Sequence, residues 1–249
     1  MPERRQVIVC HDEEDIFVRA ADLFTQLASE SVAARGRFSV ALSGGNTPHG
    51  LYTKLASDLY RNRIDWSRVH LFWGDERSVP VDHKDSNYRM ANEALISKIS
   101  IPSENIYRMS AEEADIGTAA ANYEATIRRF FNLQEGSWPR FDLILLGMGD
   151  DGHTASLFPG TQALAEKQRI VVKNWVEKFN TNRMTLTAPA INHGRNILFM
   201  TAGEKKRGPL KEVLVGVRNP ELYPSQLIQP LDGKLIWLVD EAATGGEKY

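Results

Sequence analysis

Seven short apolar runs alternate along the chain with longer segments whose apolar residues recur at helical spacing. Most of the runs are continuously apolar, as strands buried on both faces of a parallel sheet require. We expect strands at Gln6 to Cys10, Phe38 to Leu42, Val69 to Trp73, Phe141 to Leu146, Ile170 to Trp175, Asn196 to Thr201 and Leu235 to Val239. This alternation predicts an α/β protein with a largely parallel central sheet.

The helical segments lie between these strands. In the first, apolar residues between Phe17 and Ala28 recur at steps of three and one, which is typical of an amphipathic helix, and Asp12 precedes it as an expected N-cap. The expected helices are Glu14 to Ala34, Pro48 to Tyr60, Ser86 to Ile99, Glu112 to Phe131 and Lys205 to Val215. No repeat or interior linker interrupts the pattern, so we expect a single domain over 1–249 with a frayed polar tail at 244–249.

The composition is that of an ordinary globular protein, with 42% hydrophobic and 25% charged residues. A formal net charge of -2 lacks the basic field of a nucleic-acid binder, so any anion site must be local. No window reaches the roughly 20 apolar residues of a membrane span. The single cysteine, Cys10, forms no internal disulfide, which fits a reducing compartment. Because the N-terminal apolar run is too short for a signal-peptide core, we expect a cytoplasmic protein.

Candidate chemistry begins where the expected strand 38–42 runs into SGGNTP at 43–48. The two glycines allow close backbone approach, Ser43 and Thr47 offer hydroxyl groups, and the proline suits a first helical turn whose amides face an anion. A tight turn capped by Asn46 or Thr47 is an equally weighted alternative. The segment lacks the Walker lysine and is therefore not a P-loop.

A second loop, GDERSVP, follows the expected strand 69–73. It places Asp75, Glu76 and Arg77 at the carboxyl edge of the sheet, where open α/β sheets bind ligands. A solvated charged loop is the alternative. We favour a functional role because this loop is expected beside SGGNTP.

A third loop, GMGDDGHTASLFP, follows the expected strand 141–146 and formally contains GxGxxG. Two aspartates would face a pyrophosphate there, and a Pro-Gly pair interrupts any following helix, so we reject a dinucleotide site. His153 instead lies two residues after Asp151, a spacing that suits a general base oriented by a carboxylate. A surface histidine in a glycine-rich turn is the alternative.

Two lysines, Lys205 and Lys206, occupy another strand-to-helix junction, where a lysine can reach a phosphate as a point charge. Exposed lysines seldom do anything specific, so this signal alone is weak. The obvious metal ligands are His153, Asp151 and Asp75, without any HxxxH-type pairing. We therefore predict no metal.

The ordered segments LSGGNTP, FWGDERSVPVDHKDSNY, FDLILLGMGDDGHTASLFPGT, RMTLTAPAIN, TAGEKKRGPL and WLVDEAA closely resemble the 6-phosphogluconolactonases, from about Val40 to Ala243. GDER and GMGxDGHTASLFP are the specific part, whereas SGGxTP and Gly-x-x-Lys also resemble glucosamine-6-phosphate isomerases or deaminases. The resemblance implies a three-layer, Rossmann-like, mostly parallel sheet flanked by helices. It also implies hydrolysis of 6-phospho-D-glucono-1,5-lactone in the oxidative pentose phosphate pathway, without cofactor or metal.

By the same resemblance, His153 is the base that activates water and then protonates the leaving ring oxygen, and Asp151 orients it. Arg77 contacts the phosphate or the developing oxyanion, and Asp75 completes the catalytic set. The implied substrate-binding residues are Ser43, Gly44, Gly45, Asn46, Thr47, Arg77, Arg183 and Lys206. The chain departs from the family at FNTN, 179–182, which replaces a proline-rich segment beside Arg183, and at Asn46, which replaces a serine.

Two other functions compete with the lactonase. A glucosamine-6-phosphate isomerase or deaminase would carry loops like MDEY and DGHIAFNEP, with a further glutamate where this chain has Phe158-Pro159-Gly160. A sugar-phosphate sensor would lack the catalytic histidine or add a helix-turn-helix. We expect a small-molecule sugar-phosphate lactone as the ligand, no nucleic-acid or membrane partner, and a monomer or weak homo-oligomer.

Overall fold

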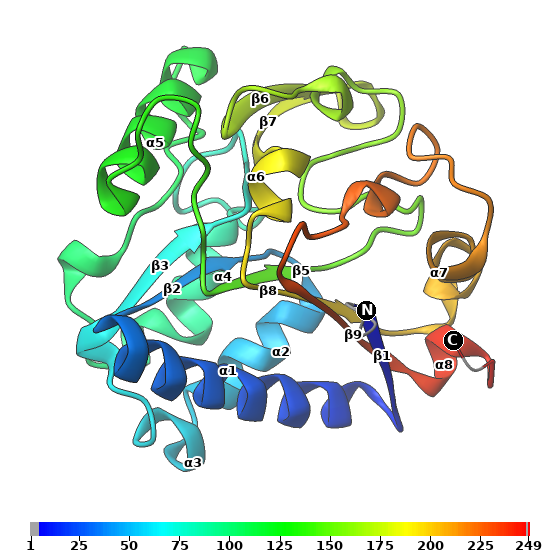
Figure 1. The fold of residues 1–249 in the computed structure, drawn as a ribbon, viewed down its shortest axis with the longest axis horizontal. Coiled ribbons are helices and arrows are strands. Elements are labelled where there is room, and N and C mark those ends of the chain that lie inside the picture. Colours follow the sequence, from blue (N-terminus) through cyan, green and yellow to red (C-terminus); the bar gives the residue numbers. More distant parts are fainter. Residues whose placement is uncertain (1–4, 248) are drawn as a thin grey trace.

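The computed structural model describes residues 5–247 and 249. A six-stranded sheet in the order β1-β9-β8-β5-β2-β3 forms its centre (Figure 1), and every neighbouring pair is parallel. The strands are β1 Arg5–Cys10, β2 Phe38–Leu42, β3 Val69–Trp73, β5 Leu143–Leu146, β8 Asn196–Thr201 and β9 Lys234–Asp240. The predicted α/β class with a largely parallel sheet is confirmed, and six of the seven expected strands belong to this sheet.

The seventh expected strand is confirmed as a strand but lies outside the central sheet. It is β6 Val171–Val176, which pairs antiparallel with β7 Thr181–Leu186; β7 in turn pairs antiparallel with β4 Asp75–Arg77. Buried and exposed residues alternate along much of β6, which identifies a strand covered on one face only. We did not predict β4 or β7, because β4 has three residues and β7 begins with polar residues.

Helices cover both faces of the central sheet. In Figure 1, α1 and α2 lie below the sheet, whereas α5, α6 and the small sheet lie above it. The helices are α1 Glu13–Arg35, α2 Asn46–Leu55, α3 Asp58–Arg61, α4 Asn87–Ala94, α5 Ile116–Phe131, α6 Ala188–Asn192, α7 Arg207–Val215 and α8 Glu241–Thr244. The three-layer, Rossmann-like arrangement is confirmed.

Caps set several helix bounds. Asp12 accepts a hydrogen bond from the Asp15 amide at 2.9 Å, which confirms the predicted N-cap of α1. The expected helix over 48–60 divides into α2 and α3, since the backbone of Ser57 is extended. The remaining three expected helices, which correspond to α4, α5 and α7, are shorter than predicted. Residues 96–98 after α4 and 204–206 before α7 form 3-10 turns, and α5 begins only after its N-cap, Asp115.

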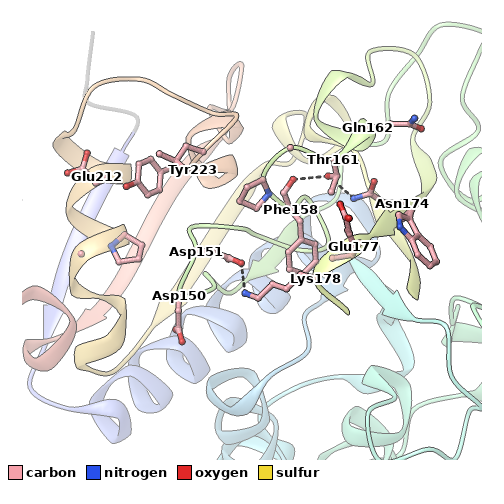
Figure 2. Close-up of a pocket in the computed structure, with 17 residues that line it drawn as sticks. Asp150, Asp151, Phe158, Thr161, Gln162, Asn174, Glu177, Lys178, Glu212 and Tyr223 are labelled. Atoms are coloured by element: carbon pink, nitrogen blue, oxygen red, sulfur yellow. Dashed lines mark hydrogen bonds and ion pairs between the residues drawn. The ribbon is translucent and has the colours of Figure 1, made fainter. Parts of the chain in front are cut away.

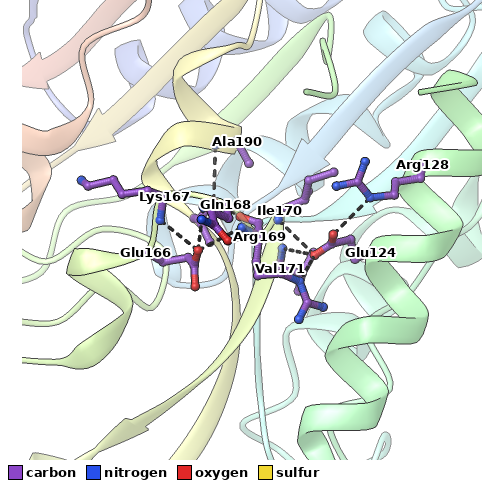
Figure 3. A network of polar contacts seen from close by, with 10 residues as sticks. Glu124, Arg128, Glu166, Lys167, Gln168, Arg169, Ile170, Val171 and Ala190 are labelled. Atoms are coloured by element: carbon purple, nitrogen blue, oxygen red, sulfur yellow. Dashed lines mark hydrogen bonds and ion pairs between the residues drawn. The ribbon is translucent and has the colours of Figure 1, made fainter. Parts of the chain in front are cut away.

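A buried glutamate fastens α5 to the small sheet (Figure 3). Glu124 accepts hydrogen bonds from the Ile170 amide at 3.0 Å and the Val171 amide at 3.3 Å, at the start of β6. Its carboxylate also receives Arg169 Nε at 2.9 Å and Arg128 Nε at 3.1 Å. Two cations and two amides therefore satisfy a charge that would otherwise be costly to bury. This contact holds the small sheet in place above the central sheet.

The predicted frayed tail begins within a helix. Thr244 is the last residue of α8 and is fully buried, and Glu247 pairs with Lys211 at 2.8 Å. Lys248 lies outside the described residues. Among the helices that the structure describes, none is both long and apolar enough to cross a membrane.

Candidate active site

The loops that follow β2, β3, β5 and β8 meet at the carboxyl edge of the central sheet, because parallel strands all end on that side. They enclose a cavity of about 340 Å³. Nine of the predicted site residues line it: Ser43, Gly44, Gly45, Asn46, Thr47, Asp75, Arg77, His153 and Lys206. Asp151 lies behind His153, and Arg183 lies opposite Arg77 in the β4–β7 pair.

The SGGNTP loop depends on its two glycines. Gly45 precedes α2 with φ of 106°, a conformation that favours glycine, and no side chain caps the α2 amides there. A Cβ on Gly44 would lie 1.8 Å from Asn87 Oδ1. Asn87 in turn donates to the Asp75 carbonyl at 2.9 Å. The glycines therefore leave α2 amides facing the cavity and let the second loop pack against the first.

A buried tyrosine fixes the start of this loop. The Tyr52 hydroxyl donates to the Ser43 carbonyl at 2.7 Å and accepts from the Ser43 amide at 3.0 Å. Burial raises the pKa of Tyr52 far above its usual value, so the phenol stays protonated. The sequence gives no sign of this role, since Tyr52 fits the apolar face of α2 like any core aromatic residue.

Glu13 lines the cavity and was also missed by the sequence analysis. It lies in the first turn of α1, and Thr47 Oγ1 donates to its Oε1 at 3.0 Å. Acidic residues are common in the first turn of a helix, which hides a further role in the sequence.

The three charged residues after β3, Asp75, Glu76 and Arg77, make two different kinds of contact. Asp75 is buried and accepts from Ser156 Oγ at 2.7 Å, and both Asp75 and Arg77 line the cavity. Glu76 accepts instead from the amides of Arg77, Asn87 and Tyr88, each at 2.8 Å, and so caps α4. Burial raises the pKa of Glu76 despite these three hydrogen bonds. Successive side chains of a strand point to opposite faces, which explains the division.

His153 is held on two sides. Its Nδ1 lies 2.5 Å from Asp151 Oδ1, and its ring stacks on Phe158 with centroids 3.9 Å apart. Lys178 Nζ lies 2.8 Å from the other carboxylate oxygen of Asp151. Burial opposes ionisation of Asp151, but the hydrogen bonds from His153 and Lys178 outweigh it and hold the pKa of Asp151 well below its usual range. Because Nδ1 is occupied by Asp151, Nε2 is the ring nitrogen available to a substrate.

Cations approach the cavity from two sides. Lys206 Nζ lies 2.5 Å from Asp150 Oδ1, and its turn is held by Asp240, whose carboxylate accepts from the Gly203 amide at 3.0 Å. Arg183 faces Arg77 across the β4–β7 pair, and burial together with the Arg77 charge lowers the pKa of Arg183. Asp240 lies in the WLVDEAA segment, where nothing in the sequence points to this contact.

A larger cavity of about 1150 Å³ lies beside the site, between the small sheet and α7 (Figure 2). Asp150 and Asp151 line it, whereas His153 lines the smaller cavity. We take the smaller cavity as the candidate active site because it combines the histidine, the helix N-terminus and the cations. Among the described residues, no group of three or more His, Cys, Asp or Glu could hold a metal ion, and the absence of a metal requirement stays a prediction.

Comparison with known proteins connects this site to a family. Residues 11–237 match the family described as glucosamine-6-phosphate isomerases/6-phosphogluconolactonase. The chain is 44% identical to a 6-phosphogluconolactonase of Synechocystis sp., over 96% of each chain. It is 40% identical to a 6-phosphogluconolactonase of Nostoc sp., over 96% of this chain and 97% of the relative.

Solved structures agree with these relatives. A 6-phosphogluconolactonase from Trypanosoma cruzi aligns with a TM-score of 0.88 at 28% identity, covering 100% of this chain and 99% of that one. A monomeric glucosamine-6-phosphate deaminase aligns with a TM-score of 0.81 over 97% of this chain and 100% of that one, but its 19% identity shows a shared fold alone. The chain therefore belongs to the family of glucosamine-6-phosphate isomerases and 6-phosphogluconolactonases.

Proposed function

We propose that the protein hydrolyses 6-phospho-D-glucono-1,5-lactone to 6-phosphogluconate, with His153 as the general base. Relatives named 6-phosphogluconolactonase at 44% and 40% identity support the reaction. One observation carries the mechanism: His153 is paired through Nδ1 with an ionised Asp151 and lines a cavity that the α2 N-terminus and Lys206 also line. The chain is thus a hydrolase acting on a sugar-phosphate lactone.

In the proposed reaction, Nε2 of His153 takes a proton from water as the water oxygen bonds to the lactone carbonyl carbon. The carbonyl electrons move to oxygen, and the oxyanion that forms lies near Arg77. When the intermediate collapses, the bond to the ring oxygen breaks and His153 returns its proton to that oxygen. Asp151 stabilises the imidazolium between these two transfers. General acid–base assistance of this kind contributes about 10² to 10⁴ in rate.

The phosphate of the substrate would bind at the other end of the cavity. Amides of SGGNTP at the α2 N-terminus, the Thr47 hydroxyl and Lys206 supply donors and positive charge there. Lys206 would exchange Asp150 for the phosphate on binding. Holding the phosphate fixes the carbonyl beside His153, and such positioning can contribute several kcal/mol to the barrier.

The deaminase alternative needs a further acid downstream of the histidine. The residue at that place is Phe158, and it stacks on the His153 ring instead of supplying a carboxylate. A sugar-phosphate sensor would have no use for the His153–Asp151 pair. We further propose that residues 1–249 form one lactonase domain. The monomeric or weakly oligomeric state and the cytoplasmic location stay predictions.

A direct assay with freshly generated lactone, corrected for spontaneous hydrolysis, tests the proposal. We expect rapid hydrolysis, a kcat/KM lower by orders of magnitude on unphosphorylated gluconolactone, and competitive inhibition by 6-phosphogluconate. Ammonia release from glucosamine 6-phosphate without lactone hydrolysis would select the deaminase. Tight binding of 6-phosphogluconate without turnover of either substrate would select the sensor.

A further inference from the structure

The turn between β6 and β7 reaches across to the His153 loop. Its residues Glu177–Phe179 form a single 3-10 turn whose members touch that loop twice. Lys178 Nζ lies 2.8 Å from Asp151 Oδ2, as Figure 2 shows. The Phe179 ring packs edge-on against Phe158 with centroids 5.7 Å apart, and Phe158 is the ring that stacks on His153.

We propose that Lys178 is a positioning residue for the reaction: it holds the Asp151 carboxylate so that Asp151 can orient His153. This inference rests on the proposed function, because it concerns how the general base of that reaction is kept in place. Lys178 lines the larger cavity and not the smaller one, so it is separated from the site where the lactone would bind.

Both oxygens of the Asp151 carboxylate are engaged. Asp151 Oδ1 faces His153 Nδ1, and Oδ2 faces Lys178 Nζ. With both oxygens engaged, the carboxylate cannot rotate without breaking a charge-assisted hydrogen bond. The low pKa of Asp151 is consistent with this arrangement, since His153 and Lys178 are the two side chains that donate to it.

Other charged groups surround the Asp151–Lys178 pair. On the sheet side, Asp150 pairs with Lys206 and Asp75 accepts from Ser156. Two further acids line the larger cavity: Glu212 of α7, and Glu177, which precedes Lys178 in the same turn. The remaining charged residues of the smaller cavity are Glu13, which accepts from Thr47, and Arg77, which donates to the Asp85 carbonyl. Within the described part of the chain, Lys178 is therefore the cation that offsets the Asp151 charge by direct contact, apart from His153 itself.

The variant Lys178→Met keeps the length of the side chain and removes its charge. We expect kcat to fall several-fold with KM unchanged. The acid limb of the kcat/KM profile should move to higher pH, because loss of the Lys178 charge leaves Asp151 to favour the protonated base more strongly. The movement should be a fraction of a pH unit, since the ion pair is half-exposed. Lys178→Arg should restore most of the activity. Lys173→Met, on the same strand pair but away from Asp151, is the matched control and should behave like the wild type.

A spectroscopic readout separates this inference from the proposed function. The Nδ1 proton of His153, identified by its loss in His153→Ala, should resonate far downfield in the wild type, and should broaden or move upfield in Lys178→Met. A wild-type protein that shows the downfield Nδ1 resonance but does not hydrolyse the lactone would contradict the proposed function and leave the positioning role intact. Lys178→Met with an unshifted pH profile and an unshifted Nδ1 resonance would overturn the positioning role, even if the variant melted at a lower temperature.

Discussion

A Cβ atom on Gly149 would lie 2.0 Å from His153 Nδ1 and 2.8 Å from Asp151 Oδ1. No real side chain fits there, so the absence of a side chain at Gly149 creates the space in which the imidazole and the carboxylate meet. Gly147 occupies the same loop, and nothing lies within 4 Å of the corresponding position. Alanine at Gly149 would therefore disturb the His153–Asp151 pair, whereas alanine at Gly147 would not.

Gly149→Ala is expected to lower kcat by about 10² or more, because the new methyl group displaces the proposed base, and general-base assistance contributes a factor of that size. Gly147 also lines the cavity, so Gly147→Ala can raise KM, but its methyl group meets no protein atom and kcat should stay near the wild-type value. Steady-state kinetics on the lactone, together with circular dichroism, make the comparison. Equal kcat values for the two variants would show that the space at Gly149 does not matter to catalysis.

His153→Ala should give a folded protein whose kcat is lower by about 10² or more, since a loop residue at a strand end carries chemistry and little packing. Asp151→Asn should lose less, because the imidazole remains. Thermal unfolding and kcat are measured on the same preparations. Near wild-type turnover by a stable His153→Ala protein would exclude His153 as the base.

Arg77→Ala and Lys206→Ala should differ in kinetic signature. If Lys206 only binds the phosphate, its loss raises KM and leaves kcat unchanged, because the interaction is equally strong in the ground state and the transition state. If Arg77 also meets the developing oxyanion, its loss lowers kcat as well. An Arg77→Ala enzyme with raised KM and unchanged kcat would reduce Arg77 to a phosphate ligand.

Stability should depend on pH through Asp151. The pKa of Asp151 is lower in the folded protein than in the unfolded chain, where an aspartate titrates at about 4. The folded state therefore binds fewer protons than the unfolded state, and the ionised carboxylate stabilises the fold at neutral pH. That contribution should decline as the pH falls below about 4 toward the lower folded-state pKa. We expect Asp151→Asn to be less stable than the wild type at pH 7 and to approach it in acid. A difference that is the same at pH 7 and in acid would contradict this account.

Tyr52→Phe should lower the free energy of unfolding by about 1 to 3 kcal/mol, because the buried amide and carbonyl of Ser43 both lose a partner. Tyr60→Phe is the control, since the Tyr60 hydroxyl reaches only the half-exposed Asp22. Urea titration of both variants gives the two values. A loss at Tyr52 no larger than at Tyr60 would contradict the role given to its hydroxyl.

The parts of the fold that could be predicted are those with a local signal. An apolar run followed within two residues by a glycine marks a buried strand and its loop, which is why the loops after β2, β3 and β5 were recognised. The strands β4 and β7 have no such signal, since their pairing joins Asp75 to Thr185 and offers only three residue pairs. The sequence therefore predicts β6 as a strand without showing that it pairs in a second sheet.

The same limit separates the predicted site residues from those that were missed. Ser43, His153 and Lys206 follow strands, and strand ends can be predicted. Lys178 meets Asp151 across 27 residues and Asp240 meets Gly203 across 37, so in each case the partner is set by tertiary packing that no local pattern encodes. Lys178 in particular follows β6, whose pairing in a second sheet the sequence does not show.

The strand order has a consequence for synthesis of the protein. β1, the first described strand, takes its place in the sheet beside β9, the last, and β9 in turn separates β1 from β8. During translation, β1 emerges from the ribosome well before the partner that holds it, and such distant pairings form slowly. Asp240, at the end of β9, also holds the turn that carries Lys206. The growing chain therefore cannot complete the contact that holds the Lys206 turn until β9 has been made and has entered the sheet.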